Sequence, residues 1–238
     1  MKIHPSLLLL ALCACGSREE GIRLHLDLDL RPAREARTEG QVRQFTTAQG
    51  ARVALTRAHV TLGSVEIFPC QTTSRTWRWL RALSPIGTAH AHEASTPRRL
   101  GIPHVSGLER PDGEALALGT LQPPPGSYCR ARLVFAPADA DAEGLTTARD
   151  MEGKTLLLEG RFEPPSGEEP AQTFHLESAS LANVEVWLEG ISLSEDALEA
   201  SRTIHLAYDT WMDGVDPTAD DAAEQVLKNI AHSATLGP

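Results

Sequence analysis

Apolar and polar residues alternate along most of this chain. Residues 22–30 (IRLHLDLDL) place Ile or Leu at every second position, with Arg, His or Asp between them. A period of two that lasts nine residues predicts a strand with one face on a core and the other in water. The alternation returns in residues 53–68, 116–121, 128–135, 154–162, 173–176, 184–188 and 203–208. We therefore expect a mainly β fold, an antiparallel β-sandwich of about seven or eight strands.

Interruptions of this pattern predict bends, loops and one helix. In residues 53–68 the phase changes near Arg57 and near Gly63, which predicts a bulge or bend within a long strand. Residues 31–50 are polar and contain a proline and two glycines, so we expect a loop. After Asp216-Pro217 the apolar residues recur at helical spacing, which predicts one short C-terminal helix. Without a repeat or a linker, residues 22–238 are expected to form a single domain.

The first residues have the features of an export signal. Residues 1–14 carry Lys2 and then an apolar run that is too short to span a bilayer. The junction at residues 12–17 (LCACGS) resembles the lipobox of bacterial lipoproteins. This resemblance implies that Cys15 is acylated with fatty acids such as palmitate, that residues 15–21 are a tether, and that the protein is held at the periplasmic face of the outer membrane. The alternative is an ordinary cleaved signal peptide.

Charge and cysteine content narrow the class of partner. The chain has 32 acidic and 22 basic residues and a formal net charge of −10, which argues against nucleic acid as a ligand. Beyond the lipobox only Cys70 and Cys129 remain. In an oxidising compartment we expect them to form a disulfide, which would contribute about 4 kcal/mol for a loop of roughly 60 residues. A metal site that uses these cysteines is the alternative.

Residues 71–104 form a basic insertion that interrupts the strand pattern. The insertion contains five arginines, one glutamate and two of the four tryptophans. Long insertions in compact domains are often functional. One hypothesis is an interaction module that uses this basic, Trp-containing segment to bind an acidic protein, lipid or glycan surface. The alternative is that Trp77 packs on one end of the sandwich while the arginines stay in water.

His90-Ala91-His92 is the sharpest local motif of the insertion. In an extended segment both imidazoles project from one face and can bind one ion. Imidazole suits copper, zinc, iron or nickel, and copper is the metal we expect in the periplasm. Because two histidines do not complete a site, a third ligand is needed, and the alternative is two solvated loop histidines. The candidates for the third ligand are His104, His59, Met151 and Met212.

Residues 139–150 resemble the EF-hand type of calcium loop. Acidic residues stand at positions one, three, five and twelve of this segment, and Gly144 stands at position six. The segment departs from the pattern because it has Glu at position five and Asp at position twelve, and no amphipathic helices flank it. The alternative is an acidic connection between two strands. The candidate calcium ligands are Asp139, Asp141, Glu143 and Asp150.

Residues 209–216 (DTWMDGVD) follow the last predicted strand and combine an aromatic residue, a thioether and three carboxylates. We interpret them as a turn whose Trp211 packs on the core. Together with the paired histidines, this segment resembles the periplasmic copper-binding partner proteins of methanobactin-type operons. The resemblance implies a β-rich fold and copper bound through His and an oxidised Trp. It carries no ligand over to a particular residue of this chain.

Motifs of the common enzyme classes are absent from the sequence. It has no G-x-S-x-G, G-x-G-x-x-G, P-loop or H-E-x-x-H motif. We therefore expect a binding protein and no enzyme. The preferred function is an outer-membrane lipoprotein that binds copper through His90, His92 and a third ligand, with a periplasmic protein as a possible partner. The alternative is the non-metal interaction module described above.

Overall fold

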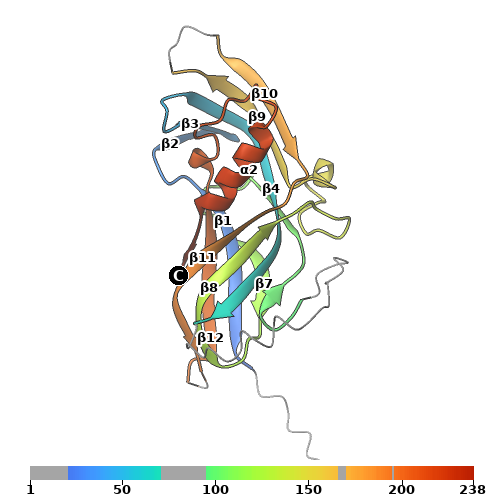
Figure 1. Ribbon diagram of the computed structural model, residues 1–238, viewed down its shortest axis with the longest axis vertical. Coiled ribbons are helices and arrows are strands. Elements are labelled where there is room, and N and C mark those ends of the chain that lie inside the picture. Colours follow the sequence, from blue (N-terminus) through green and yellow to red (C-terminus); the bar gives the residue numbers. More distant parts are fainter. Residues whose placement is uncertain (1–20, 71–94, 166–169, 195) are drawn as a thin grey trace, which may run out of the picture.

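A computed structural model describes residues 21–70, 95–165, 170–194 and 196–238. It shows an elongated molecule with two sheets and one C-terminal α-helix (Figure 1). The predicted mainly β fold with a terminal helix is therefore confirmed. The smaller sheet has the strand order β13-β12-β1-β7. Its strands are β1 (Arg23–Arg31), β7 (Leu116–Leu121), β12 (Glu199–Ala207) and β13 (Ala234–Gly237).

The larger sheet is built around one long strand, β4 (Arg52–Pro69). Along one edge of β4, its first half pairs with β9 and its second half pairs with β8. On their far sides β9 pairs with β10, and β8 pairs with β11. The register places β3, β6 and β5 on the other edge, and β2 pairs with β3. The other strands are β2 (Ala36–Glu39), β3 (Val42–Thr46), β5 (Arg99–Leu100), β6 (His104–Gly107), β8 (Gly126–Phe135), β9 (Leu156–Glu163), β10 (Gln172–Ser178) and β11 (Ala182–Leu193).

The predicted irregularities of β4 are confirmed. Its register with β9 shifts between Leu55 and Arg57, and its register with β8 shifts between Leu62 and Ser64. Between these shifts the neighbours of β4 change from β3 and β9 to β5 and β8. Residues 136–155, which connect β8 to β9, lie outside these strands. A Cβ at Gly63 would lie 2.8 Å from the Cβ of Ala136. Glycine therefore allows the start of this connection to approach β4.

The core lies between the two sheets. The alternate apolar residues of β1 are almost fully buried and face the inward side chains of β4 and β8, as the alternation predicts. Along the sides, β11 lies against β13 and β5 lies against β7, so strands of both sheets enclose the lower half of the molecule in Figure 1. The core residues of this half include Leu24, Leu26, Leu28, Leu62, Val65, Ile67, Leu133 and Phe135.

The predicted disulfide is confirmed. Cys70 follows β4 and Cys129 lies in β8, with their Cα atoms 4.8 Å apart and a sequence separation of 59. The bond ties together two strands that already pair. On the chain-entropy model a loop of this length contributes about 4 kcal/mol to the free energy of unfolding.

The predicted C-terminal helix is α2 (Ala222–Ser233), which begins later than Asp216-Pro217. Its buried stripe includes Val226, Leu227 and Ile230, and it packs against β10, β11 and β12. Among the residues described, no helix is long and apolar enough to cross a membrane. The helix is followed by β13, an edge strand that the pattern did not predict.

Three expectations about the strands were wrong. The structure has thirteen strands in the described residues, where the alternation predicted about seven or eight. The predicted loop at residues 31–50 contains the hairpin β2–β3, which turns at Gly40 with φ of +61°. The sheets are also not wholly antiparallel, because β1 pairs with β12 in parallel. Short edge strands with a wet face have little apolar alternation, and pairing direction leaves no local signal.

Candidate functional site

His59 and His104, two of the proposed metal ligands, lie on opposite faces of the larger sheet. In the β4–β6 register His59 pairs with Gly107 and His104 pairs with Leu62. Positions 59 and 62 are three residues apart on β4, so their side chains point to opposite faces. These two candidates for the third ligand therefore do not lie side by side.

His59 is buried against the backbone of β6 on the outer face of the sheet. Arg57 Nε donates to His59 Nε2 over 3.3 Å, and His59 Nδ1 has no hydrogen-bond acceptor within the described ranges. The nearest carboxylate oxygen, Glu109 Oε2, is 3.7 Å from Nδ1. Burial lowers the pKa of His59 below its ordinary value of 6.5, although Glu109 acts in the opposite direction. His59 is thus a neutral, half-satisfied imidazole.

His104 faces the other side and interacts with a different acid. Its Nδ1 lies 2.8 Å from the carbonyl oxygen of Ile102, and its Nε2 lies 3.2 Å from Glu143 Oε2. Across the described ranges, no three His, Cys, Asp or Glu side chains are grouped so that they could hold a metal ion. The His-x-His motif (His90 and His92) and the acylation site Cys15 lie outside the described residues.

The acidic segment 139–150 is folded onto the outer face of the sheet, where Met151 is fully buried in a small second core. Gly144 has φ of +88°, which agrees with the predicted sharp turn. The candidate ligands do not converge: Asp150 binds Arg57 at 2.5 Å, whereas Glu143 faces His104. The hydrogen bond from Arg57 lowers the pKa of Asp150. The other two candidate calcium ligands are Asp139 and Asp141. Asp139 accepts a hydrogen bond from the backbone N–H of Asp141.

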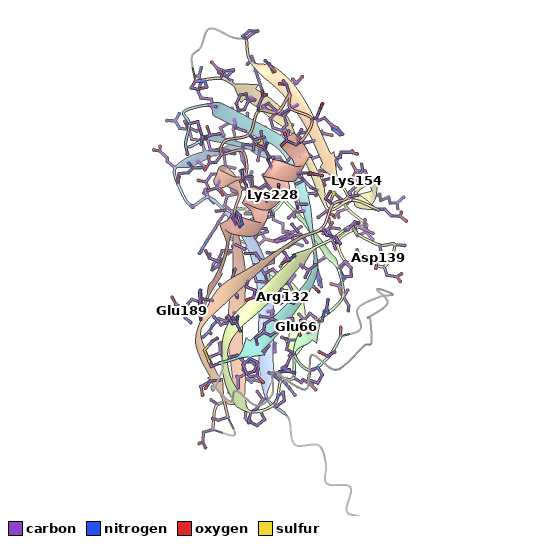
Figure 2. All side chains as sticks on the ribbon, viewed as in Figure 1. Glu66, Arg132, Asp139, Lys154, Glu189 and Lys228 are labelled. Carbon is purple, nitrogen blue, oxygen red and sulfur yellow. A yellow bond between two sulfur atoms is a disulfide. The ribbon has the colours of Figure 1, made fainter. Side chains whose placement is uncertain are left out.

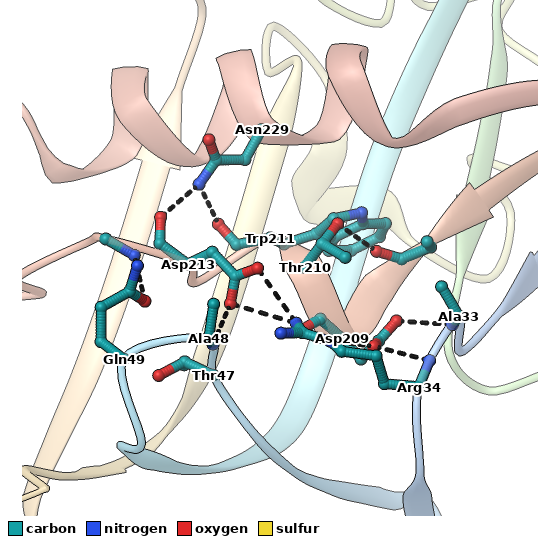
Figure 3. A network of polar contacts seen from close by, with 12 residues as sticks. Ala33, Arg34, Thr47, Ala48, Gln49, Asp209, Thr210, Trp211, Asp213 and Asn229 are labelled. Atoms are coloured by element: carbon teal, nitrogen blue, oxygen red, sulfur yellow. Dashed lines mark hydrogen bonds and ion pairs between the residues drawn. The ribbon is translucent and has the colours of Figure 1, made fainter.

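The segment that follows β12 is part of a polar network that we call the Arg34 anchor: Arg34, Asp209, Asp213 and Asn229 (Figure 3). Asp209 is fully buried and accepts the backbone N–H groups of Ala33 and Arg34 at 2.7 and 3.0 Å. The Nε of Arg34 donates to the same carboxylate at 2.9 Å. Buried carboxylates need such partners, so the anchor is a structural element that joins the end of β1 to the end of β12.

The anchor also ties α2 to the turn that follows β12. Asp213 accepts from Arg34 Nη2 at 3.0 Å and from the backbone N–H of Ala48 at 2.8 Å. Asn229 of α2 donates to the carbonyl oxygens of Trp211 and Asp213. Burial disfavours the charge of Arg34, but the hydrogen bonds to Asp209 and Asp213 outweigh it and raise its pKa. Trp211 is fully buried, as expected for a turn whose Trp packs on the core.

A groove of about 880 Å³ opens beside the anchor, over β2, β3, β4 and β9. We call it the arginine groove. Its volume is in the range of ligand-binding pockets. Two glutamates are among the residues that line it. The arginines that line it are Arg34, Arg37, Arg52 and Arg161.

The strand register explains how the groove is built. Arg37, Gln44, Ala54 and Arg161 follow one another across four strands in directly paired positions. All four face outward, and the small Ala54 leaves a hollow between longer side chains. Strand spacing puts the Cα atoms of Arg37 and Arg161 roughly 14 Å apart, so both guanidinium groups can reach a ligand above Ala54.

The four arginines differ in what neutralises them. Arg34 is bound to the acids of the anchor, and Arg52 is paired with Glu163. Within the described part of the chain, Arg37 and Arg161 have neither an ion pair nor a side-chain hydrogen bond. These two exposed cations are the residues of the groove that are free to bind an anion.

A second hollow of about 720 Å³ lies between the end of the smaller sheet and α2. His205 of β12 points into it, with its Nδ1 2.8 Å from Oδ1 of the buried Asp29. His232 of α2 lines the same hollow. A carboxylate that holds one imidazole nitrogen leaves the other nitrogen in a defined orientation.

The sequence reasoning missed both hollows. Their residues come from strands far apart in the chain, and Arg37 and Arg161 are separated by 124 positions. One local signal was present: the alternation predicted His25, Asp27 and Asp29 on the face of β1 that is turned to water, although Asp29 is in fact buried. No local pattern named the partner, His205.

Comparison with known proteins does not assign this chain to a family. No protein-family model matches this sequence, and neither a curated protein nor a solved structure was found to be similar to it.

Proposed function

We propose that this protein is an envelope-anchored binding protein whose arginine groove holds a ligand with phosphate or carboxylate groups. The observation that carries this proposal is the pair Arg37 and Arg161. Both are exposed, both flank the hollow above Ala54, and neither has an acid partner among the described residues. On a chain with a net charge of −10, two free cations in one hollow are unusual.

The chemistry of the groove fits an oxyanion. A guanidinium group offers paired N–H donors that match carboxylate and phosphate geometry. Gln44 lies between the free arginines and adds a polar side chain, which donates to Glu39 over 3.3 Å in the unliganded protein. The envelope address rests on the lipobox at Cys15, and the disulfide Cys70–Cys129 supports an oxidising compartment.

The test is calorimetric titration of the full-length protein with inorganic pyrophosphate and with citrate. We expect Arg37→Ala and Arg161→Ala each to weaken binding on the order of tenfold, because one charge-assisted hydrogen bond contributes about 1.5–3 kcal/mol. The affinity should also fall with added salt. Arg149→Ala is the matched control, since Arg149 is exposed on η1 (Arg149–Met151), outside the groove. Equal affinity of the wild type and the Arg37/Arg161 double variant would refute the proposal.

A second candidate function is binding of a transition metal such as copper, predicted from His90 and His92. The specific observation that favours it is the Asp29–His205 pair, because His205 lines the same hollow as His232. Carboxylate-bound imidazoles are common among metal ligands. Titration with Cu²⁺ and Zn²⁺ tests this idea on three proteins: wild type, His90→Ala/His92→Ala and His205→Ala. Unchanged metal affinity in both variants removes it, and binding by the arginine groove should be indifferent to chelators.

A further inference from the structure

Trp187 is the most exposed large hydrophobic side chain in the described residues, with 74% of its surface in contact with solvent. It lies on β11, on the face that the lower half of the larger sheet turns to solvent. The register with β8 shifts directly after Trp187, between Trp187 and Ile191. Bulges of this kind commonly re-aim a side chain. A large exposed indole beside polar groups is a side chain of the kind that is enriched at binding surfaces.

The neighbours of Trp187 form two rows across the strands. In the first row Phe68, Arg130 and Trp187 occupy paired positions on β4, β8 and β11. In the second row charges alternate through Arg99, Glu66, Arg132 and Glu185 on β5, β4, β8 and β11. We call these seven residues the Trp187 platform. Figure 2 shows Glu66 and Arg132 on this face, with Glu189 beyond them on β11.

Three polar groups of the platform, those of Arg130, Arg132 and Glu185, are held in place by one another. The two carboxylate oxygens of Glu185 accept from Arg130 at 2.9 Å and from Arg132 at 3.0 Å. The guanidinium of Arg132 also lies over the ring of Phe68, 5.1 Å from its centre. The disulfide between Cys70 and Cys129 ties β4 to β8 beside this row. Arg130 and Arg132 keep further N–H donors for a ligand, because each donates to Glu185 through one nitrogen.

We propose that the Trp187 platform binds a neutral polysaccharide. The face of an indole is electronegative, so it attracts the C–H groups of a sugar ring, which neighbouring oxygens make electropositive. The fixed guanidinium and carboxylate groups beside it can then donate to and accept from the hydroxyl groups at the edge of the ring.

The charge balance of the platform selects an uncharged ligand. The platform itself holds three arginines (Arg99, Arg130 and Arg132) and two glutamates (Glu66 and Glu185), and Glu189, the next exposed acid along β11, brings the sum of these six charges to zero. An acidic or basic partner would therefore gain no net attraction here, in contrast with the arginine groove. A protein partner fits less well, because stable protein interfaces bury about 800 Å² per partner around a core depleted in charge. Here a single exposed indole is surrounded by ions.

The experiment is calorimetric titration of the full-length protein with neutral hexasaccharides of glucose and of N-acetylglucosamine. We expect at least one series to bind, with an affinity that salt does not change. Trp187→Ala should weaken binding on the order of tenfold, and Trp187→Phe should retain part of it, because a smaller ring still stacks. Leu181→Ala is the matched control, since Leu181 is 72% exposed but lies between β10 and β11, outside the platform.

Two results would overturn the proposal: no hexasaccharide binds, or Trp187→Ala binds as well as the wild type. Loss of self-association on Trp187→Ala in sedimentation velocity would instead identify a protein interface, and this also overturns it. Arg130→Gln gives a second variant if Trp187→Ala fails to fold. The Arg37/Arg161 double variant should keep full sugar affinity, so failure of this inference is distinguishable from failure of the proposed anion site.

Discussion

The Arg34 anchor and the arginine groove meet at Arg34, yet charge has different roles in the two regions. In the anchor every charged group has a partner, and Asp209 is shielded from water by the chain segments that it joins. On the two flanks of the groove Arg37 and Arg161 face water without partners among the described residues. Charges that are fully satisfied hold the fold together, whereas charges left free at a hollow are available to a ligand.

A similar contrast separates the groove from the Trp187 platform. Both are built from paired positions on the outer face of the larger sheet. The groove leaves Arg37 and Arg161 without an acid among the described residues, whereas the platform sets its arginines beside glutamates and exposes an indole. The same scaffold thus presents surfaces for two different ligand chemistries.

The largest effect is expected from Asp209→Ala, which removes the buried side of the anchor. Arg34 and two backbone N–H groups would lose their acceptor, and we expect the free energy of unfolding to fall by about 3–5 kcal/mol. Urea denaturation followed by circular dichroism measures this. Asp216→Ala is the control, because the exposed Asp216 bonds only within its own turn to Thr218. A loss no greater than that of the control would mean that the anchor is not structural.

Asp213→Ala should cost less, because Asp213 is partly open to water, with 26% of its side chain exposed. We expect a loss of about 1–2 kcal/mol from the hydrogen bonds to Arg34 and Ala48. The same denaturation experiment applies. If Asp213→Ala destabilised the protein more than Asp209→Ala, burial would not explain the difference between the two acids.

In contrast with the acids of the anchor, Arg37 and Arg161 of the arginine groove should contribute little to the stability of the fold. Replacing Arg37 and Arg161 together by Ala should change the free energy of unfolding by less than about 0.5 kcal/mol, since neither residue has a partner to lose in the part of the chain that the structure describes. Thermal unfolding of the double variant beside Arg149→Ala measures this. A large destabilisation would show that these arginines belong to the fold and would weaken their assignment to a ligand.

The smallest effect concerns His59, which is buried like Asp209 but only half satisfied. Burial lowers its pKa in the folded protein below 6.5, the value expected when unfolded. The unfolded chain therefore binds the proton more tightly. The stabilising contribution is complete above about pH 6.5 and is lost as pH falls through the folded pKa.

We expect the midpoint of urea unfolding to decrease less between neutral and mildly acidic pH in His59→Gln than in the wild type. His175→Gln is the control, because His175 is exposed and hydrogen-bonded to Glu159 and Glu177. An identical pH dependence in wild type and His59→Gln would contradict the assignment of His59 as a buried neutral imidazole.

Several elements of this fold could be predicted because their signals are local. The alternation of β1 specified a strand with one buried face, and the apolar stripe of α2 specified a helix. The phase changes within β4 marked its bulges. Two cysteines left for an oxidising compartment specified the disulfide. The strand, helix and bulge predictions depend on residues that are near one another in the chain. The disulfide prediction depends on the number of cysteines, because two cysteines can pair in only one way.

The interpretation of isolated side chains was less reliable. His59 and His104 were both named as candidate ligands because of their residue type. His104 pairs with Leu62, which lies three positions after His59 on β4, so the two side chains point to opposite faces. Asp150 and Glu143 were grouped by spacing, but each one interacts with a cation or imidazole outside the segment. The spacing of the acids was preserved, and the rest of the fold determined where they point.

By itself the sequence determined the strand-rich class, the burial of alternate side chains, the terminal helix and the disulfide, because period, propensity and composition act over short stretches of chain. Only the tertiary structure decided that β1 pairs in parallel with β12, that Asp209 binds a residue 175 positions away, and that Arg37 and Arg161 flank one hollow. These arrangements depend on which strands become neighbours. Strand pairing is decided by the collective packing of the core between two sheets, and no short segment carries that information.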